Sequence, residues 1–262
     1  MPQIREILAS HPVGLITDID GTISHIAPRQ DDARISEQCR KSLVKLTSHL
    51  HLLAFITGRS STNAKDMIGI QNALYLGNHG LDRFYGKTIE TDQRCEQFIP
   101  YMQMLLRQLG PTLNTNGVVI EDKGVSVGIH YRQCDEPALA RKHILDTLYQ
   151  ITDLEAITIT EGKKIVEIRP NIGTNKGTSL KRLMEEFDLR GILYLGDDIA
   201  DVEAFKTLRR LTMPNTGNIG LAIGVLGDES VDGLDREADM LLTGVEETEQ
   251  LLESIAGLYE SN

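Results

Sequence analysis

Short runs of consecutive apolar residues recur along the chain, and each run ends at polar residues or glycine. Four clear runs span residues 13–16, 52–56, 73–76 and 192–195. Each run is continuous rather than alternating, which is typical of strands buried on both faces of a sheet. Stretches with helical spacing lie between them, at about residues 36–49, 178–187 and 201–208. This alternation predicts βαβ units and therefore an α/β fold built around a parallel sheet.

The middle of the chain follows a different pattern, which predicts an inserted domain. A long helical pattern starts at about Glu90, and we expect it to stop at Gly110-Pro111. Two expected hairpins follow, with a helix between them: strands 117–121 and 124–132, helix 136–150, and strands 156–160 and 163–169, with turns at 122–123 and 161–162. The order αββαββ indicates a small antiparallel sheet backed by two helices. We place this inserted domain at residues 86–173 and the surrounding core domain at residues 1–85 and 174–262.

The composition of the chain limits which binding partners and which cellular setting we expect. The chain has 262 residues and a net charge of −11 at pH 7, which argues against nucleic acid or an anionic membrane surface as the main partner. No apolar run approaches the length of a membrane span, and the first ten residues lack the apolar stretch of a secretory signal. Cys39, Cys95 and Cys134 are widely spaced, so we interpret them as small buried hydrophobes of a cytoplasmic protein rather than as disulfide or zinc ligands.

The first apolar run ends in a pair of aspartates, Asp18 and Asp20, which Gly21 follows. Residues two apart in a strand face the same side, so the two carboxylates start out together. Such a repelling pair usually binds a metal, shares a proton, or combines a nucleophile with an acid/base. For the motif alone, a polar strand end that leads into a turn is the alternative.

Three more polar clusters fall at expected strand ends or helix starts. The hydroxyl of Thr57, which precedes Gly58, could donate to a phosphate or simply form a turn. Lys176 opens an expected helix, where its charge would add to an anion-binding N-terminus, unless it is a solvated lysine. Asp197 and Asp198, with Asp201 three residues on, offer hard oxygen ligands suited to Mg²⁺; the alternative is simple N-capping of the next helix by Asp198 or Asp201. Because ligands of parallel sheets bind at the carboxyl ends of the strands, we expect all four clusters at one edge.

These clusters, in this order, resemble the four motifs of haloacid dehalogenase-superfamily phosphatases. The inserted domain resembles an α/β cap of that superfamily, so the expected fold is a Rossmann-like parallel-sheet core with an inserted α+β cap domain. Further stretches are similar to the trehalose-6-phosphate phosphatase family: TGRS, GNHGL, EDKGVSVGIHYR, KIVEIRP and GDDIADVEAF. Two positions depart from the family motif GDDxTDE, with Ala200 in place of Thr and Val202 in place of Glu.

The resemblance implies hydrolysis of a sugar phosphate through an aspartyl-phosphate. It makes Asp18 the nucleophile and Asp20 the acid and base. Mg²⁺ is expected on Asp18, the backbone carbonyl of Asp20, Asp197 and Asp198, and the phosphate on Thr57, Gly58 and Lys176. Substrate contacts are expected from Arg59, Asn78, His79, Glu121, Lys123, His130, Arg132 and Glu167. A cross-strand pair is as good an interpretation of His130 and Arg132, and a turn or packing role is as good for His79.

Trehalose 6-phosphate is the substrate that the resemblance favours, with a functional link to a trehalose-phosphate synthase as the implied partnership. The alternatives are a phosphatase acting on sucrose-phosphate, mannosylglycerate-phosphate or hexose phosphates, a phosphomutase, and a non-catalytic sugar-phosphate-binding module. Intact Asp18 and Asp20 argue against the binding module, because binding alone requires no nucleophile beside an acid. In the enzyme, the cap is expected to close over the sugar and set specificity.

Overall fold

The computed structural model describes residues 1–29, 32–227 and 231–260. The chain forms two compact units, which we call the core (Met1–Glu90 and Thr174–Asn262) and the cap (Thr91–Gly173). None of the helices in the described ranges combines the length and the apolar character that a membrane-spanning segment needs. Each of the three cysteines is buried, as the sequence predicts.

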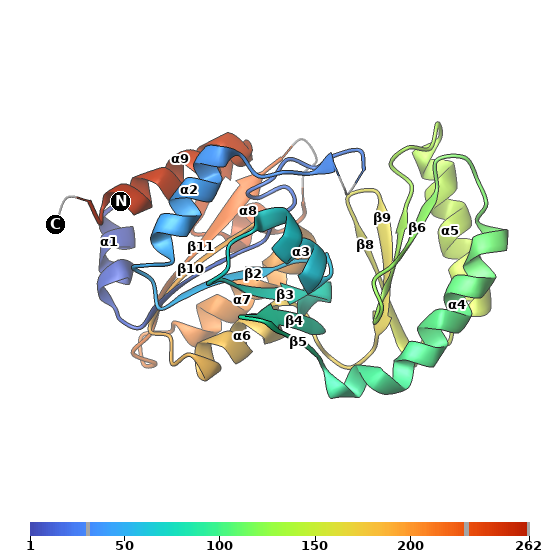
Figure 1. Ribbon diagram of the computed structural model, residues 1–262, viewed down its shortest axis with the longest axis horizontal. Coiled ribbons are helices and arrows are strands. Elements are labelled where there is room, and N and C mark those ends of the chain that lie inside the picture. Colours follow the sequence, from blue (N-terminus) through green and yellow to red (C-terminus); the bar gives the residue numbers. More distant parts are fainter. Residues whose placement is uncertain (30–31, 228–230, 261–262) are drawn as a thin grey trace. The chain divides into compact units, whose positions relative to one another are not determined.

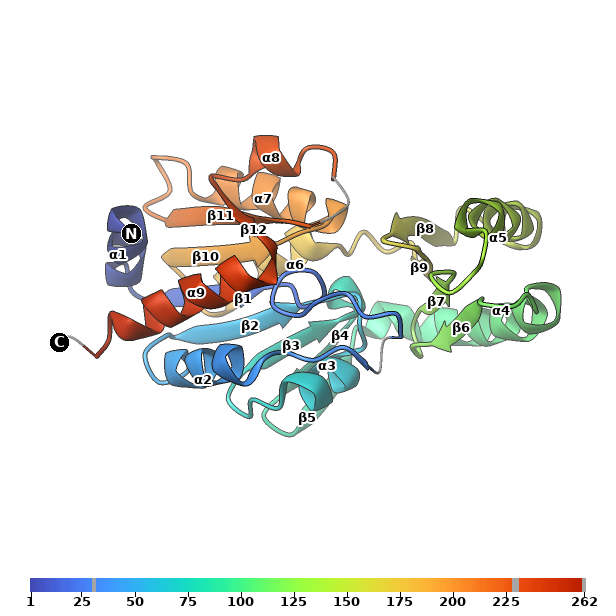
Figure 2. The same ribbon diagram turned by 90° about the horizontal axis from the view of Figure 1, so that it is seen from above.

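Within the described residues, eight strands form one sheet in the order β12-β11-β10-β1-β2-β3-β4-β5 (Figures 1 and 2). The strands are β1 (Val13–Thr17), β2 (Leu52–Ile56), β3 (Leu74–Gly77), β4 (Asp82–Tyr85), β5 (Thr88–Thr91), β10 (Gly191–Gly196), β11 (Ile219–Leu226) and β12 (Met240–Thr243). All neighbours from β12 to β3 pair in parallel, whereas β3 and β4 are antiparallel. The predicted α/β fold with a parallel-dominated sheet is confirmed.

Helices cover both faces of this sheet (Figure 2). One face packs against α1 (Pro2–Ala9), α2 (Glu37–Leu46), α3 (Ser61–Ile68) and α9 (Gly244–Gly257), and the other against α6 (Lys176–Glu186), α7 (Ile199–Leu211) and α8 (Leu234–Glu237). Successive residues of a strand enter different clusters: Leu15 packs with the first set of helices and Ile16 with the second. The β1 run is therefore continuously apolar because both faces of the strand are buried.

Side-chain caps fix where the site helices begin. Asn175 accepts a hydrogen bond from the backbone N–H of Thr178 at the start of α6, and the Thr178 hydroxyl completes a capping box. Asp198 and Asp201 form the same reciprocal arrangement at the start of α7. Ser36 caps α2 by accepting from the N–H of Cys39, as its position in the sequence predicts. The sequence thus sets the N-termini of α6 and α7 at the residues that carry the polar clusters.

The described part of the cap contains an antiparallel sheet in the order β6-β7-β9-β8 and two long helices (Figure 1). Its elements are a 3-10 helix (Gln93–Phe98), α4 (Ile99–Thr112), β6 (Val119–Asp122), β7 (Val127–His130), α5 (Pro137–Ile151), β8 (Ile157–Gly162) and β9 (Ile165–Pro170). Leu105 and Ile144 of the helices pack on Ile129 and Ile168 of the sheet. Because side chains alternate along a strand, the opposite face of the cap sheet is left to polar residues.

Several boundaries and turns in the middle of the chain differ from the prediction. The first hairpin turns at residues 123–126 rather than 122–123, because Asp122 pairs with Val127. The helical pattern begins later than Glu90, because residues 88–91 pair as β5 and the side chain of Asp92 then starts a 3-10 helix by accepting from the N–H of Arg94. Helix α4 continues through Pro111 to Thr112, since a proline in the last turn removes only one helical hydrogen bond. The second hairpin turns at residues 163–164 rather than 161–162, with Lys164 at a φ of 59°.

Candidate active site

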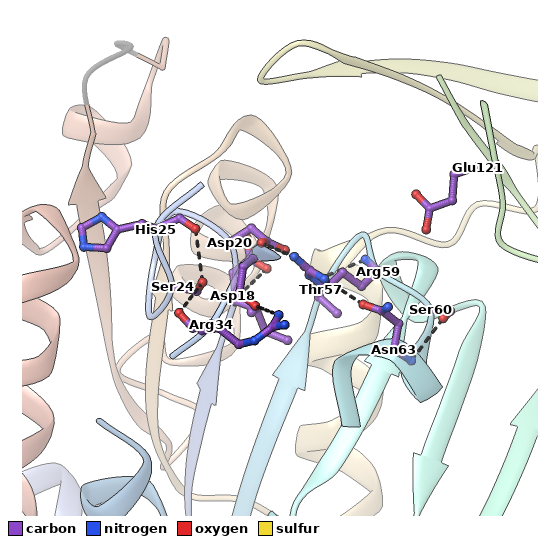
Figure 3. A network of polar contacts seen from close by, with 12 residues as sticks. Asp18, Asp20, Ser24, His25, Arg34, Thr57, Arg59, Ser60, Asn63 and Glu121 are labelled. Atoms are coloured by element: carbon purple, nitrogen blue, oxygen red, sulfur yellow. Dashed lines mark hydrogen bonds and ion pairs between the residues drawn. The ribbon is translucent and has the colours of Figure 1, made fainter. Parts of the chain in front are cut away.

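Asp18 lies at the carboxyl edge of the core sheet, directly after β1 (Figure 3). It is 4% exposed, and its Oδ2 lies 2.8 Å from Nζ of Lys176. Its Oδ1 accepts a hydrogen bond of 2.6 Å from the backbone N–H of Ile19. Burial raises the pKa of Asp18 to about 7, although the Lys176 ammonium acts in the opposite direction. Without a further cation, this carboxyl group therefore changes charge near neutral pH.

Lys176 is the first residue of α6 and is fully buried. Its Nζ lies 2.8 Å from Asp18, 2.9 Å from Asp201 and 3.3 Å from Asp198. Burial disfavours the ammonium, but these carboxylates hold the pKa of Lys176 well above its usual value. The burial excludes a solvated lysine and leaves a fixed positive charge beside Asp18.

Asp201 anchors this network, although the sequence offers it only as a possible helix cap and not as a site residue. Its Oδ1 accepts from Nζ of Lys176 and from the hydroxyl of Tyr194, each at 2.9 Å. Its Oδ2 accepts from the backbone N–H groups of Asp197 and Asp198 at 3.0 and 3.1 Å. Burial raises the pKa of Asp201 well above its usual value, although the Lys176 ammonium acts in the opposite direction. The four hydrogen bonds hold the Asp201 side chain in one position. Asp201 therefore fixes the position of the Lys176 ammonium.

Asp197 faces the loop that follows β1. The hydroxyl of Thr22 donates to its Oδ1 at 2.8 Å. Gly21 has a φ of 91°, and a Cβ built there would lie 2.0 Å from Oδ2 of Asp197. Only glycine allows the loop to approach this carboxylate so closely. Thr22 is a second site residue that sequence reasoning misses, although it directly follows Gly21 in the segment DIDGT (residues 18–22).

The cluster of aspartates fits a divalent cation. Asp18, Asp197 and Asp201 each offer a carboxylate oxygen within 4.8 Å of the others. The single Lys176 ammonium does not balance their charge, and all the donors are hard oxygens of the kind that Mg²⁺, Mn²⁺ and Ca²⁺ prefer. Each oxygen of Asp201 accepts from two donors, whereas each oxygen of Asp18 has one such partner among the described residues, so Asp18 is the better placed metal ligand of these two.

Asp198 has a double role at the start of α7. Its side chain accepts from the backbone N–H of Asp201 at 2.9 Å, which is the capping role that the sequence offered as an alternative to metal binding. Burial opposes ionisation, but the Lys176 ammonium and the hydrogen bond with Asp201 hold the pKa of Asp198 well below its usual range, with a smaller contribution from His79. Asp198 therefore carries a negative charge at the edge of the cluster.

Arg59 forms a bidentate pair of hydrogen bonds with the carboxylate of Asp20 (Figure 3). Its Nε donates to Oδ2 at 2.6 Å and its Nη2 to Oδ1 at 2.7 Å. Its Nη1 donates to Oδ1 of Asn63, in the first turn of α3, at 2.8 Å. The Arg59 side chain is 5% exposed, whereas that of Asp20 is 33% exposed. The sequence assigns Arg59 to the substrate, and the structure directs its guanidinium to Asp20.

The predicted phosphate-binding loop follows β2. Oγ1 of Thr57 accepts from the backbone N–H of Arg59 at 3.2 Å, so its own proton can be donated elsewhere. Gly58 lies in the same loop, between β2 and α3. The backbone oxygen of Thr57 accepts from the N–H of His79 at 2.8 Å, which ties this loop to the one after β3. The hydroxyl of Thr57 thus lies at the same sheet edge as Asp18.

Asn78 and His79 belong to a 3-10 helix (Asn78–Gly80) that directly follows β3. Both have positive φ angles, 49° and 59°, which are uncommon for residues other than glycine. Nδ2 of Asn78 donates to Oδ1 of Asp82 at 2.7 Å, and the backbone oxygen of His79 accepts from the hydroxyl of Ser179 on α6. These contacts give both residues a part in shaping the loop, in addition to any substrate contact.

Four of the predicted substrate-binding residues meet on one face of the cap sheet. Nζ of Lys123 lies 2.6 Å from Oε1 of Glu167 and 3.8 Å from Oε2 of Glu121. Nε2 of His130 lies 2.9 Å from the same oxygen of Glu121. Carboxylates and an ammonium group side by side can accept from and donate to neighbouring sugar hydroxyls. The cluster thus places hydrogen-bond donors and acceptors side by side on one face of the cap sheet.

Two other positions are explained by local structure. Arg132 donates from Nη2 to the backbone oxygen of Lys163 at 2.7 Å, so it supports the turn between β8 and β9. Val202, where the family motif has Glu, is 2% exposed and packs in the hydrophobic cluster of α6, α7 and α8. The valine thus extends the core, and Asp201, which directly precedes it on α7, keeps its contact with Lys176.

Comparisons with known proteins agree with this arrangement. Residues 16–231 match the model of the trehalose-phosphatase family. The chain is 28% identical over 242 residues to the probable trehalose-phosphate phosphatase D of Arabidopsis thaliana, covering 86% of this chain and 62% of that protein. It is 30% identical over 216 residues to trehalose-phosphate phosphatase B of the same plant, covering 74% and 56%. The chain thus spans about three fifths of the length of these curated relatives.

Solved structures share the fold. The C-terminal domain of the trehalose-6-phosphate phosphatase of C. albicans superposes with a TM-score of 0.82 at 21% identity, covering 98% of this chain and 96% of that one. A haloacid dehalogenase-like hydrolase from Bacteroides thetaiotaomicron gives a TM-score of 0.63 at 13% identity, covering 92% and 98%. The family match extends over the DIDGT, Lys176 and GDD segments. Because the family model matches residues 16–231, the chain belongs to the trehalose-phosphatase family, and it has the fold of a haloacid dehalogenase-like hydrolase.

Proposed function

We propose that this chain is a Mg²⁺-dependent phosphatase that hydrolyses trehalose 6-phosphate to trehalose and phosphate. The observation that carries the proposal is the buried contact between Asp18 and Lys176 at the carboxyl edge of the core sheet, with Asp20 next to it. A nucleophile beside a fixed cation suits attack on an anionic phosphate. The names of the relatives support trehalose 6-phosphate as the substrate.

The first half of the reaction transfers the phosphoryl group to the protein. A carboxylate oxygen of Asp18 forms a bond to phosphorus while the bond from phosphorus to the sugar oxygen breaks. Asp20 donates its proton to the departing sugar oxygen, so trehalose leaves as a neutral alcohol. Lys176, the Thr57 hydroxyl and the Gly58 loop face the charge on the phosphoryl oxygens.

The second half regenerates Asp18. Asp20, now ionised, takes a proton from a water molecule whose oxygen attacks phosphorus, and the bond between phosphorus and Asp18 breaks. Arg59 keeps the Asp20 carboxylate in one orientation through both halves. Mg²⁺, held by Asp18, Asp197, Asp198 and the backbone carbonyl of Asp20, would supply positive charge that offsets the charge on the phosphoryl oxygens.

Sugar recognition is the role that we assign to the cap. Glu121, Lys123 and Glu167 would bind the hydroxyls of trehalose, and His130 would orient Glu121. A phosphate group alone does not distinguish one sugar from another, so discrimination requires such polar contacts. The enzyme that supplies the substrate would be a trehalose-phosphate synthase, and the buried cysteines fit a reducing cytoplasm.

The test is a phosphate-release screen over a panel of sugar phosphates. The panel contains trehalose 6-phosphate, sucrose 6-phosphate, mannosylglycerate phosphate, glucose 6-phosphate and p-nitrophenyl phosphate, each with Mg²⁺ and with EDTA. We expect the highest kcat/KM for trehalose 6-phosphate and no release with EDTA or with the Asp18→Asn variant. A higher kcat/KM for another sugar phosphate would reassign the substrate. Metal-independent binding without release from any ester would favour a binding module.

A further inference from the structure

Gly128 lies at the centre of the cap sheet, between the two acidic residues of the cap cluster. On β7 it is in register with Glu121 of β6 on one side and with Glu167 of β9 on the other. Its neighbours Val127 and Ile129 pack into the hydrophobic cluster of the cap. Because side chains alternate along a strand, position 128 points to the polar face that carries the two glutamates.

Lys123 crosses the strand at this position. It follows β6, yet its Nζ pairs with Oε1 of Glu167 on β9, at 2.6 Å. Neighbouring strands lie about 4.8 Å apart, so the lysine side chain extends over the whole width of β7 to reach its partner. A Cβ built on Gly128 would lie 3.2 Å from Cε of Lys123 and 3.3 Å from Oε2 of Glu121. The lysine therefore lies closer than ordinary van der Waals contact to the position that a Cβ at 128 would take.

We propose that Gly128 is a positioning residue for sugar recognition: the side chain that it lacks is what allows Lys123 to cross β7 and stand between Glu121 and Glu167. The inference rests on the proposed function for its substrate, and it adds a residue that binds nothing itself. The ammonium supplies donors and the two carboxylates supply acceptors, so the cluster can bind adjacent sugar hydroxyls of both kinds at once.

A larger residue at 128 would undo this arrangement. The Cβ of alanine makes contacts of 3.2–3.4 Å, which the flexible end of Lys123 can relieve by a small shift. The two methyl groups of valine extend further from the backbone into the path of the lysine. Lys123 would then move away from Glu167. The cluster would lose the hydrogen-bond donors of the ammonium group, and the Glu167 carboxylate would lose the positive charge that neutralises it.

The effect should appear in the KM for the sugar phosphate and nowhere else. For Gly128→Val we expect KM for trehalose 6-phosphate to rise about tenfold or more, with kcat little changed, because sugar contacts lie away from the reacting phosphate. For Gly128→Ala we expect a rise of about threefold or less. The kcat/KM for p-nitrophenyl phosphate, which has no sugar, should stay at the wild-type value for both variants. The matched control is Thr160→Val, because Thr160 lies on β8 opposite Glu167 in the same cross-strand row. This substitution should leave kcat/KM unchanged for both trehalose 6-phosphate and p-nitrophenyl phosphate.

A double-mutant cycle with Lys123→Ala separates positioning from simple obstruction. If Gly128 acts through Lys123, the Gly128→Val substitution should add little to KM once the lysine is absent. An equal rise in KM on the Lys123→Ala background would overturn the proposal, because valine would then be blocking the sugar directly. Gly128→Ser repeats the cycle with less bulk if the valine variant fails to fold, and the same coupling with Lys123→Ala is expected.

A crystal structure of the Gly128→Val variant tests the proposal without any substrate. We expect Nζ of Lys123 to lie outside ion-pair distance of Glu167. A retained contact near the present 2.6 Å would refute the positioning role. A wild-type enzyme that shows no preference for trehalose 6-phosphate would instead refute the proposed function, and the crystal structure would still decide the role of Gly128.

Discussion

Replacing Lys176 with methionine removes the only ammonium group in contact with Asp18, Asp198 and Asp201 in the described structure, and nearly preserves its shape. Lys176 is fully buried, so water cannot compensate the carboxylates that it leaves. Breaking a buried ion pair from one side typically destabilises a protein by about 3–5 kcal/mol. We expect Lys176→Met to lower the free energy of unfolding by about this amount at pH 8.5 in EDTA.

The destabilisation should depend on pH. Burial already raises the pKa of Asp18 to about 7 in the folded chain, above its value of 3.8 in a model peptide. The folded state therefore binds more protons than the unfolded state between these values, and stability falls as the pH rises through 7. Lys176 lowers this pKa, so its removal raises it further. The loss caused by Lys176→Met should be smaller at pH 5.5, where Asp18 is protonated, than at pH 8.5.

Urea unfolding followed by circular dichroism measures both effects, with and without Mg²⁺. Lys181→Met is the matched control, because Lys181 is on the same helix, is 56% exposed and, among the described residues, has only Glu185 as a partner, at 3.7 Å. Its loss should change stability by about 0.5 kcal/mol or less at any pH. Excess Mg²⁺ should stabilise Lys176→Met relative to EDTA, since the cation binds only the folded state. A Lys176→Met variant that matches Lys181→Met, or that loses equal stability at both pH values, would refute this electrostatic account.

Three further predictions concern the same site. Tyr194→Phe removes one hydrogen-bond donor to Asp201 and should lower kcat by about tenfold for every phosphate ester. The control Tyr75→Phe removes a buried hydroxyl that donates to a backbone oxygen, and it should leave kcat unchanged. Equal effects of the two substitutions in steady-state assays would contradict a role for Tyr194 in positioning Lys176. Arg59→Lys keeps the positive charge but loses the bidentate hydrogen bonding to Asp20, so kcat should fall by about tenfold with KM little changed. An unchanged kcat would show that Asp20 does not need Arg59 to hold its orientation. Mg²⁺ binding at pH 6 should release close to one proton per protein, because the metal displaces the proton of Asp18. At pH 8.5 the release should be much less than one proton, because Asp18 is already ionised. Isothermal titration calorimetry in buffers of different ionisation enthalpy measures the release, and equal values at both pH values would contradict the raised pKa of Asp18.

The parts of the site that follow local patterns are the ones the sequence predicts. Asp18 follows an apolar run at the end of β1, and Lys176 opens a helix, so periodicity and capping are enough to place each of them at one edge of the sheet. The hydrophobic pattern also predicts the parallel core and the αββαββ order of the cap. Gly110-Pro111 misleads because a proline near the end of a helix removes only one hydrogen bond.

The contacts that sequence reasoning misses join residues far apart in the chain. Asp20 and Arg59 are separated by 39 positions, and Lys123 and Glu167 by 44. Tyr194 looks like one more apolar residue of a buried strand, and only the fold places its hydroxyl against Asp201. The role that we propose for Gly128 likewise depends on cross-strand register, which a single sequence does not specify. Local patterns thus indicate the chemistry, whereas tertiary pairing decides how each group is held.

Trapping the covalent intermediate tests the central claim, that this site hydrolyses phosphate esters through Asp18. The enzyme is mixed with trehalose 6-phosphate and Mg²⁺, quenched with acid within one turnover and treated with borohydride, which reduces an aspartyl-phosphate to homoserine. Mass spectrometry of the peptides then locates the modified position. The account predicts homoserine at position 18 in the wild-type protein and none in the Asp18→Asn variant. Phosphate release without modification of Asp18, or with modification of a different aspartate, would contradict it.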